Sequence, residues 1–142
     1  MGLDRGGFDE DLLAALIEPI NEGRRLLAIA RQLIPTLVGP GTPLTVSDAA
    51  VKLMGTLTPA GYRAALDALP GWDARERLAG LAVPTLCLAG ELDKLAAPAA
   101  MESLAALVPD ARIEVVPHAG HLLQVEQPDQ VARAIRSFIV RM

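Results

Sequence analysis

Leucine, isoleucine and alanine recur at steps of three and four residues between about residues 9 and 38. This spacing places apolar side chains on one face of a helix and predicts amphipathic helical structure over the segment. Pro19 has no backbone N–H and its ring clashes with the preceding turn, so we expect a break near Glu18 and two helical pieces. The glycine- and proline-rich segment 39–43 ends the region.

Two more helices are expected further along. Thr45 stands three residues before Asp48, which is typical of a capping box and predicts a helix through about Gly55. Thr58 followed by Pro59 predicts an N-cap and the first position of another helix. The chain up to about residue 75 is therefore expected to be all-helical.

The second half of the chain alternates between strand and helix patterns. Two short apolar runs, VPTLCLA and ARIEVVP, suit buried strands, and a proline opens a helical pattern after each of them. The expected elements are a strand at 83–89, a helix at 98–108, a strand at 111–117 and a helix at 128–140. This order predicts a parallel strand pair joined by a right-handed crossover. We expect a helical region at 1–75 and an α/β segment at 76–142.

Composition narrows the possible partners. The chain of 142 residues holds 13 Lys and Arg against 17 Asp and Glu, and only 3% of its residues are aromatic, so we expect no nucleic-acid partner. Its apolar stretches are too short to cross a bilayer, and its N-terminus lacks the basic start of a signal peptide, so we expect no membrane partner. A single cysteine, Cys87, excludes an internal disulfide and favours a cytoplasmic location.

Two polar residues follow the predicted strands. Asp93 comes just after the first strand and His121 just after the second. Parallel strands end at the same edge of a sheet and lie about 5 Å apart, so a short loop can bring the carboxylate to the imidazole. An acid in this place fixes the tautomer of the ring and stabilises the imidazolium when the other ring nitrogen takes a proton. Gly120 is expected to let the backbone turn tightly before His121.

The segments LAVPTLCLAGELD and PDARIEVVPHAGHLLQVEQPDQVARAIRSFI resemble the C-terminal portion of an α/β-hydrolase, over residues 81–140. The markers are Gly-x-x-Asp ending at Asp93, Gly-His 28 residues later, and Glu-x-Pro beginning at Glu126. The resemblance implies that Asp93 is the acid of a catalytic triad, that His121 is its general base, and that the helical stretch is a cap over the substrate pocket. The closest likeness is to enol-lactonase and small-esterase members.

The nucleophile that such a pair activates is missing from the sequence. The nucleophile elbow of this family has the pattern Gly-x-Ser-x-Gly, but Ser47, Ser103 and Ser137 have no glycine at either flanking position. Cys87 lies in the middle of a predicted strand and is expected to be a core residue. In the family, the nucleophile and the oxyanion donors come from an N-terminal half, which is absent here.

His118 offers a different reading of the same loop. With His121 and Glu126 it could be imagined as a metal ligand. The spacing is neither that of a helical His-x-x-x-His nor that of a cysteine-bearing site. We therefore expect an ordinary loop histidine, with no metal and no cofactor.

These observations lead to two main hypotheses. The first is a hydrolase of carboxylic esters or lactones, represented by its cap and the acid and base of its triad, that needs an N-terminal half for activity. The alternative is a catalytically silent binding or assembly module that keeps the half-fold, and a truncated hydrolase is a third reading. Expected partners are a small ester or lactone, a complementing half, or a second copy of the chain, because one edge of the first strand has no inherited neighbour.

Overall fold

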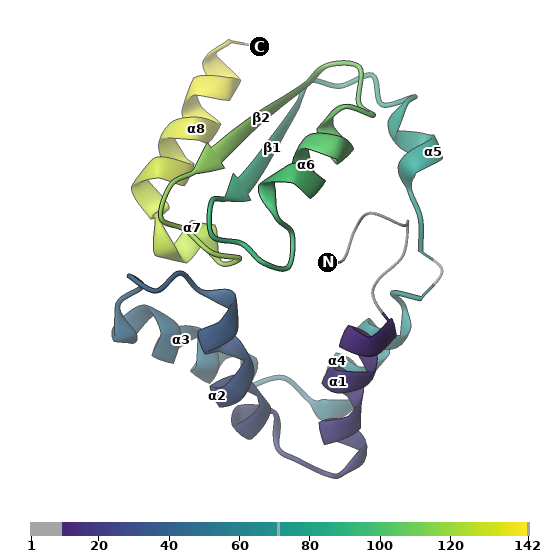
Figure 1. Ribbon diagram of the computed structural model, residues 1–142, viewed down its shortest axis with the longest axis vertical. Helices are drawn as coiled ribbons and strands as arrows, with labels where there is room; N and C mark the ends of the chain where they lie inside the picture. The colour runs from purple at the N-terminus through teal and green to yellow at the C-terminus, as the bar shows by residue number, and fades with distance from the viewer. Residues whose placement is uncertain (1–9, 71, 142) are drawn as a thin grey trace. The chain divides into compact units, whose positions relative to one another are not determined.

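The computed structural model describes residues 10–70 and 72–141 (Figure 1). These fall into two compact units. The helical unit comprises the chain up to Thr36 together with Pro43–Asp73, and the α/β unit comprises Leu37–Thr42 together with the chain from Ala74 onward. The short segment 37–42 thus belongs with the α/β unit. Residue 9, where the helical pattern is expected to begin, lies outside the described residues.

The helical unit is built from four helices, of which the first and the fourth pack against each other. They are α1 (Glu10–Asn21), α2 (Leu26–Leu37), α3 (Leu44–Met54) and α4 (Pro59–Asp67). The buried residues of α2, which are Leu26, Ile29, Ala30 and Ile34, keep the three- and four-residue spacing of a single helix face. Leu13, Val51 and Leu66 are the buried apolar side chains from the other three helices. The expected helical structure of this region is therefore confirmed.

The break predicted near Glu18 is wrong, because α1 continues through Pro19 to its end two residues later. The chain breaks instead at Gly23, whose φ is 75°. The Gly23 amide donates to the Ile20 carbonyl at 2.9 Å and the Arg24 amide donates to the Pro19 carbonyl at 3.0 Å, which is the Schellman arrangement of a helix C-terminus. Proline lacks a donor but keeps its carbonyl, so Pro19 takes part in the cap that ends the helix.

The two predicted N-caps differ in outcome. Thr58 caps α4 as predicted, since its hydroxyl accepts the Gly61 amide at 3.1 Å. The capping box predicted from Thr45 is not formed, because α3 begins one residue earlier at Leu44 and its N-cap, Pro43, makes no side-chain cap hydrogen bond. Proline fixes the backbone at the entry to α3 and leaves Thr45 inside the first turn.

The α/β unit contains two parallel strands with helices around them. Its elements are α5 (Arg75–Leu78), β1 (Thr85–Gly90), α6 (Pro98–Ala105), β2 (Ala111–Val116), α7 (Leu123–Glu126) and α8 (Pro128–Val140). β1 pairs with β2 in parallel, which confirms the predicted strand pair. Figure 1 shows α6 and α8 on either side of the pair, and both helices contact both strands.

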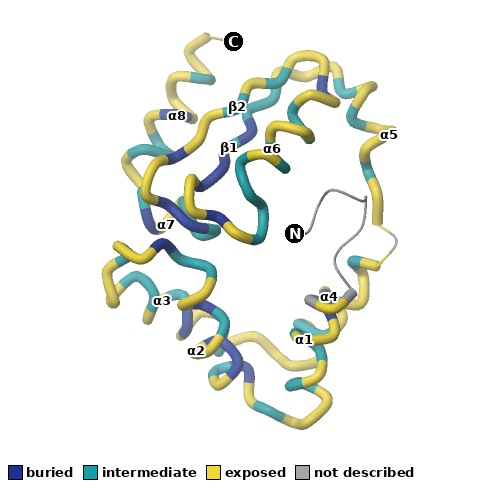
Figure 2. Tube along the Cα trace, in the orientation of Figure 1, coloured by how far each residue is buried: buried dark blue, intermediate teal, exposed yellow. Residues whose placement is uncertain are grey.

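Burial in the α/β unit follows β1, the end of β2 and the loop after it (Figure 2). β1 starts at Thr85, two residues later than predicted, because Pro84 cannot donate to a strand ladder and Val83 before it is 57% exposed. Ile135 of α8 is 42% exposed. Ala134 is the residue of α8 that is buried. Among the described residues, none of the helices combines the length and the hydropathy needed to span a bilayer.

Candidate active site

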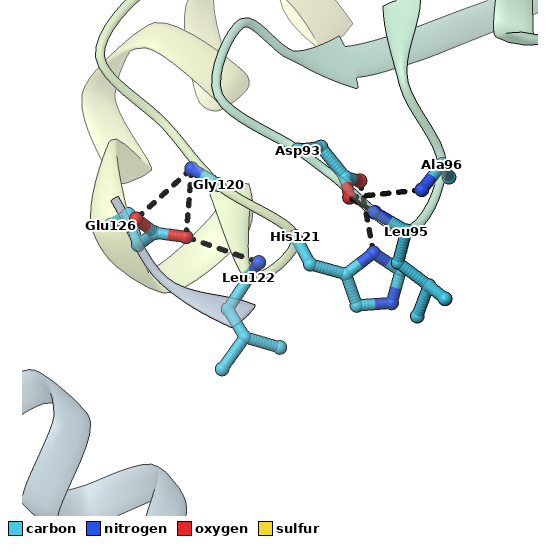
Figure 3. A network of polar contacts seen from close by, with 7 residues as sticks. All are labelled: Asp93, Leu95, Ala96, Gly120, His121, Leu122 and Glu126. Atoms are coloured by element: carbon cyan, nitrogen blue, oxygen red, sulfur yellow. Dashed lines mark hydrogen bonds and ion pairs between the residues drawn. The ribbon is translucent and has the colours of Figure 1, made fainter. Parts of the chain in front are cut away.

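Asp93 and His121 meet beyond the C-terminal ends of the two strands (Figure 3). Gly90, the last residue of β1, lies opposite Val116, the last residue of β2, so the two following loops leave the sheet at the same edge. The imidazole Nδ1 of His121 lies 2.9 Å from Oδ2 of Asp93. The structure thus brings together the two residues that the sequence selects, and their catalytic role remains a prediction.

Asp93 is a buried carboxylate whose two oxygens have different partners. Oδ1 accepts the amides of Leu95 at 2.8 Å and Ala96 at 2.9 Å, which fixes the loop after β1 around the carboxylate. Oδ2 is the oxygen that faces His121. The backbone amides hold the carboxylate at one oxygen, so the other is oriented toward the ring.

His121 is a half-exposed side chain paired with a buried one. A carboxylate only accepts hydrogen bonds, so pairing through Nδ1 puts the proton of the neutral ring on that nitrogen. Nε2 then carries the lone pair and can take a proton from an incoming group. The backbone amide of His121 donates to the Leu37 carbonyl at 2.7 Å, which ties the loop to the segment 37–42.

Two glycines allow three backbone segments to pack closely at this site. A Cβ on Gly90 would overlap the carbonyl oxygen of Gly120, and a Cβ on Gly120 would overlap the carbonyl oxygen of Leu37. The sequence predicts a tight turn at Gly120, but the glycine with positive φ among the described residues is Gly23. Close approach of neighbouring backbones, and not turn geometry, is therefore the reason for glycine at position 120.

His118 lies in the same loop but points to solvent, and its side chain is 83% exposed. Its φ is 61°, and its backbone amide donates to Oε2 of Glu91 at 2.8 Å. In the described part of the chain, no group of three or more His, Cys, Asp and Glu side chains is arranged to hold a metal ion. Glu126, the third residue of the metal reading, instead accepts hydrogen bonds from the backbone.

Glu126 is the polar residue of this unit whose role sequence reasoning missed. In the sequence it is the first residue of the Glu-x-Pro marker and the third residue of the metal reading, and neither gives it a role in the loop of His121. In the structure it is a buried carboxylate that accepts the amides of Gly120 and Leu122, on either side of His121 (Figure 3). An acidic residue placed shortly after a candidate catalytic histidine was the available signal.

The serines and the cysteine do not stand on the loops that carry the pair. Ser47 and Ser103 donate to carbonyls of their own helices, at 3.1 and 2.9 Å, and Ser137 lies on α8. Cys87 is buried in the middle of β1, and burial raises the pKa of its thiol. A buried thiol with a raised pKa is a poor nucleophile at neutral pH, so Cys87 is a core residue.

The model of the alpha/beta hydrolase family matches residues 3–134, and the chain belongs to that family. It is 36% identical over 74 residues to a pimeloyl-[acyl-carrier protein] methyl ester esterase of Stenotrophomonas maltophilia, which covers 52% of this chain and 29% of that protein. It is also 36% identical over 97 residues to a protein of the same name from Xanthomonas campestris, covering 64% of this chain and 38% of the other. The resemblance to this family seen in the sequence is confirmed.

Solved structures agree with this membership. A thermophilic esterase from Thermogutta terrifontis matches 96% of the chain with a TM-score of 0.81 and 28% identity, and 53% of that structure is covered. The enol-lactonase from Burkholderia xenovorans LB400 shares the fold, with a TM-score of 0.79 and 21% identity, over 92% of this chain and 50% of that one. The chain thus spans about half the length of these structures and a smaller share of the two esterases matched by sequence.

Proposed function

We propose that this chain carries the acid and the base of a hydrolase that cleaves carboxylic esters or lactones, and that it works with a nucleophile supplied by an N-terminal half. The observation that carries the proposal is the 2.9 Å contact between His121 Nδ1 and Asp93 Oδ2 at the shared end of two parallel strands. The names of the similar proteins, which are esterases and an enol-lactonase, support this substrate class.

In the proposed reaction, Nε2 of His121 takes the proton of a hydroxyl nucleophile as that oxygen attacks the carbonyl carbon. Asp93 stabilises the imidazolium that forms, and it holds the ring so that Nε2 faces the reacting atoms. The imidazolium then returns the proton to the departing alkoxide. A water molecule, deprotonated by the same nitrogen, hydrolyses the acyl intermediate and regenerates the pair.

Helices of residues 1–75 are part of the proposal as a cap that shapes the substrate pocket. The boundary between the two compact units, at residues 73 and 74, lies close to the end of this stretch, although the segment 37–42 belongs to the α/β unit. The cytoplasmic location favoured by the sequence also stays part of the proposal.

A chimera with one of the similar esterases tests this function. The part of the Thermogutta terrifontis esterase that this chain matches is replaced by the chain, and hydrolysis of p-nitrophenyl butyrate is measured. We expect turnover by the chimera, loss of nearly all of it in the His121→Ala variant, and only background hydrolysis by the 142-residue chain alone. Turnover that survives His121→Ala contradicts the proposal, and a folded but inactive chimera favours the silent binding module.

Association is the second part of the proposal. In the described sheet β1 pairs with β2 along one of its sides. The other side of β1 is an edge of the sheet, and an unpaired edge is a template for a strand from another chain. We propose that this edge is covered by a complementing half or by a second copy of the chain. Light scattering at micromolar concentration is expected to show a species larger than the monomer, and a folded monomer that melts cooperatively contradicts this.

A further inference from the structure

Glu126 gathers donors from two parts of the α/β unit that are distant in sequence. From the segment 37–42, Oε2 accepts the Gly39 amide and the Thr42 hydroxyl, both at 2.7 Å. From the loop after β2, the Gly120 amide donates to Oε1 at 3.1 Å and to Oε2 at 3.0 Å, and the Leu122 amide donates to Oε1 at 3.1 Å. One carboxylate therefore joins both segments.

These contacts surround the backbone of His121. Its amide donates to the Leu37 carbonyl at 2.7 Å, while the amides on either side of it both donate to Glu126 (Figure 3). Leu37 belongs to the same segment that Glu126 holds through Gly39. Glu126 thus fixes the two neighbours of His121 and also the segment that carries the acceptor of the His121 amide.

The site suits an acceptor and excludes a donor. Each of these groups donates a hydrogen bond to Glu126, and the residue is only 9% exposed, so the lost hydration of its carboxylate is compensated by these donors. The packing is close as well, because a Cβ on Gly39 would lie 3.2 Å from Oε2 and 3.1 Å from the His118 carbonyl oxygen. A glutamine at this place would keep one acceptor oxygen but would turn its NH₂ group toward donors at the other position.

We propose that Glu126 is a positioning residue for His121, which holds the loop so that Nδ1 of the ring meets Asp93. A contribution of Glu126 to catalysis rests on the proposed function. Its effect on the orientation of the His121 ring does not rest on that function. Without Glu126 the amides beside His121 lose their acceptor, the loop turns to find water, and the imidazole loses its alignment with Oδ2 of Asp93.

Nitrogen NMR of the imidazole rings tests this in the full chain. The sequence holds two histidines, so exposed His118 serves as the internal reference for His121. In the neutral ring of wild-type His121 we expect mainly the Nδ1–H tautomer. In the folded Glu126→Gln variant we expect loss of this preference and a mixture of both tautomers. Retention of the Nδ1–H tautomer in that variant overturns the proposal.

Thr42→Val is the matched control. It removes one hydrogen bond to Glu126 on the side of the segment 37–42 and leaves the Gly120 and Leu122 contacts in place. We expect a lower urea midpoint with the His121 tautomer unchanged. If Thr42→Val lost the tautomer preference as fully as Glu126→Gln, the ring would be responding to lower stability of the unit and not to the contacts beside His121. That result would contradict the proposal.

Amide hydrogen exchange in the wild-type chain gives a second test that needs no folded Glu126 variant. Because Gly39, Gly120 and Leu122 share one acceptor, their amides are expected to show a common protection from exchange, relative to the rate of each amide in the unfolded chain. Fast exchange at Gly39 with protection at Gly120 overturns the proposal. Neither measurement depends on turnover, so an inactive chimera would refute the proposed function while leaving this inference intact.

Discussion

The polar contacts inside the helical unit differ in kind from those inside the α/β unit. In the helical unit, polar side-chain contacts lie on exposed faces, such as the 2.8 Å ion pair of Arg63 and Asp67 and the 2.6 Å hydrogen bond that Arg63 donates to Asn21. In the α/β unit, Glu126 binds Gly39 across 87 residues of sequence and Asp93 binds His121 across 28. Both buried acidic side chains of the described residues, Asp93 and Glu126, belong to this second unit.

This difference shows where the molecule is sensitive to change. An exposed ion pair contributes little, because water competes for both partners and salt screens them. A buried carboxylate leaves several donors without partners when it is removed, and that loss is large. We therefore expect the α/β unit to respond sharply to single-atom changes that the helical unit would tolerate.

The largest expected effect is that of Asp93→Asn on the activity of the chimera. The amide can present its NH₂ group to Nδ1, which favours the wrong tautomer of His121 and removes the charge that stabilises the imidazolium. We expect kcat to fall by about 10⁴-fold. His118→Gln serves as the control, because this exposed side chain points to solvent and its change is expected to leave kcat within about twofold. A chimera whose kcat is unchanged by Asp93→Asn would place the acid elsewhere.

Gly120→Ala comes next, as a test of close packing. The added Cβ would overlap the Leu37 carbonyl oxygen and lie 2.8 Å from the Gly39 nitrogen, so the backbones must separate. We expect a loss of about 3 kcal/mol in the free energy of unfolding, measured with urea. Gly41→Ala is the matched control in the neighbouring segment, since its Cβ would meet nothing within 4 Å, and it should change stability by less than about 0.5 kcal/mol. Equal stability of the two variants would contradict the packing described.

A smaller effect is expected at the helix caps of the helical unit. Thr58→Ala removes the acceptor of the Gly61 amide and should lower the free energy of unfolding by about 1 kcal/mol. Thr45→Ala should change it by less than about 0.5 kcal/mol, because Thr45 is inside α3 and does not cap it. Thermal unfolding of both variants, followed by circular dichroism, checks this prediction. A larger loss of stability in Thr45→Ala than in Thr58→Ala would contradict it and support the capping box expected from the sequence.

The sequence predicted those parts of the fold that depend on local patterns. Helical spacing, the Thr58 cap, the strand pair and the meeting of Asp93 with His121 follow from short stretches of chain. Two of the errors arise where distant segments decide. The role of Glu126 depends on Gly39, and glycine at position 120 depends on Leu37, and neither partner can be found from the loop itself. The break expected near Pro19 was wrong for a local reason, because proline keeps a carbonyl that can accept a hydrogen bond in the cap of a helix.

The smallest effect at neutral pH is expected at Cys87, in the core of β1. Burial raises the pKa of its thiol, so the folded chain keeps the proton at a pH where the unfolded chain has lost it. The resulting stability is fully present below the ordinary thiol pKa and is lost as the pH rises through the raised value. Urea unfolding followed from neutral to alkaline pH should therefore show a decline that Cys87→Ala lacks, after correction for its lower baseline.

Alkylation of Cys87 sharpens the same prediction. At pH 8 the native chain should react with iodoacetamide far more slowly than the chain in urea, because the thiolate is the reactive species and burial disfavours it. Native reactivity equal to that of the unfolded chain would mean that β1 opens freely, which is the behaviour expected of an edge strand whose partner is absent. In that case addition of a complementing half should protect the thiol, and the extent of protection would measure how far the second edge of β1 depends on another chain.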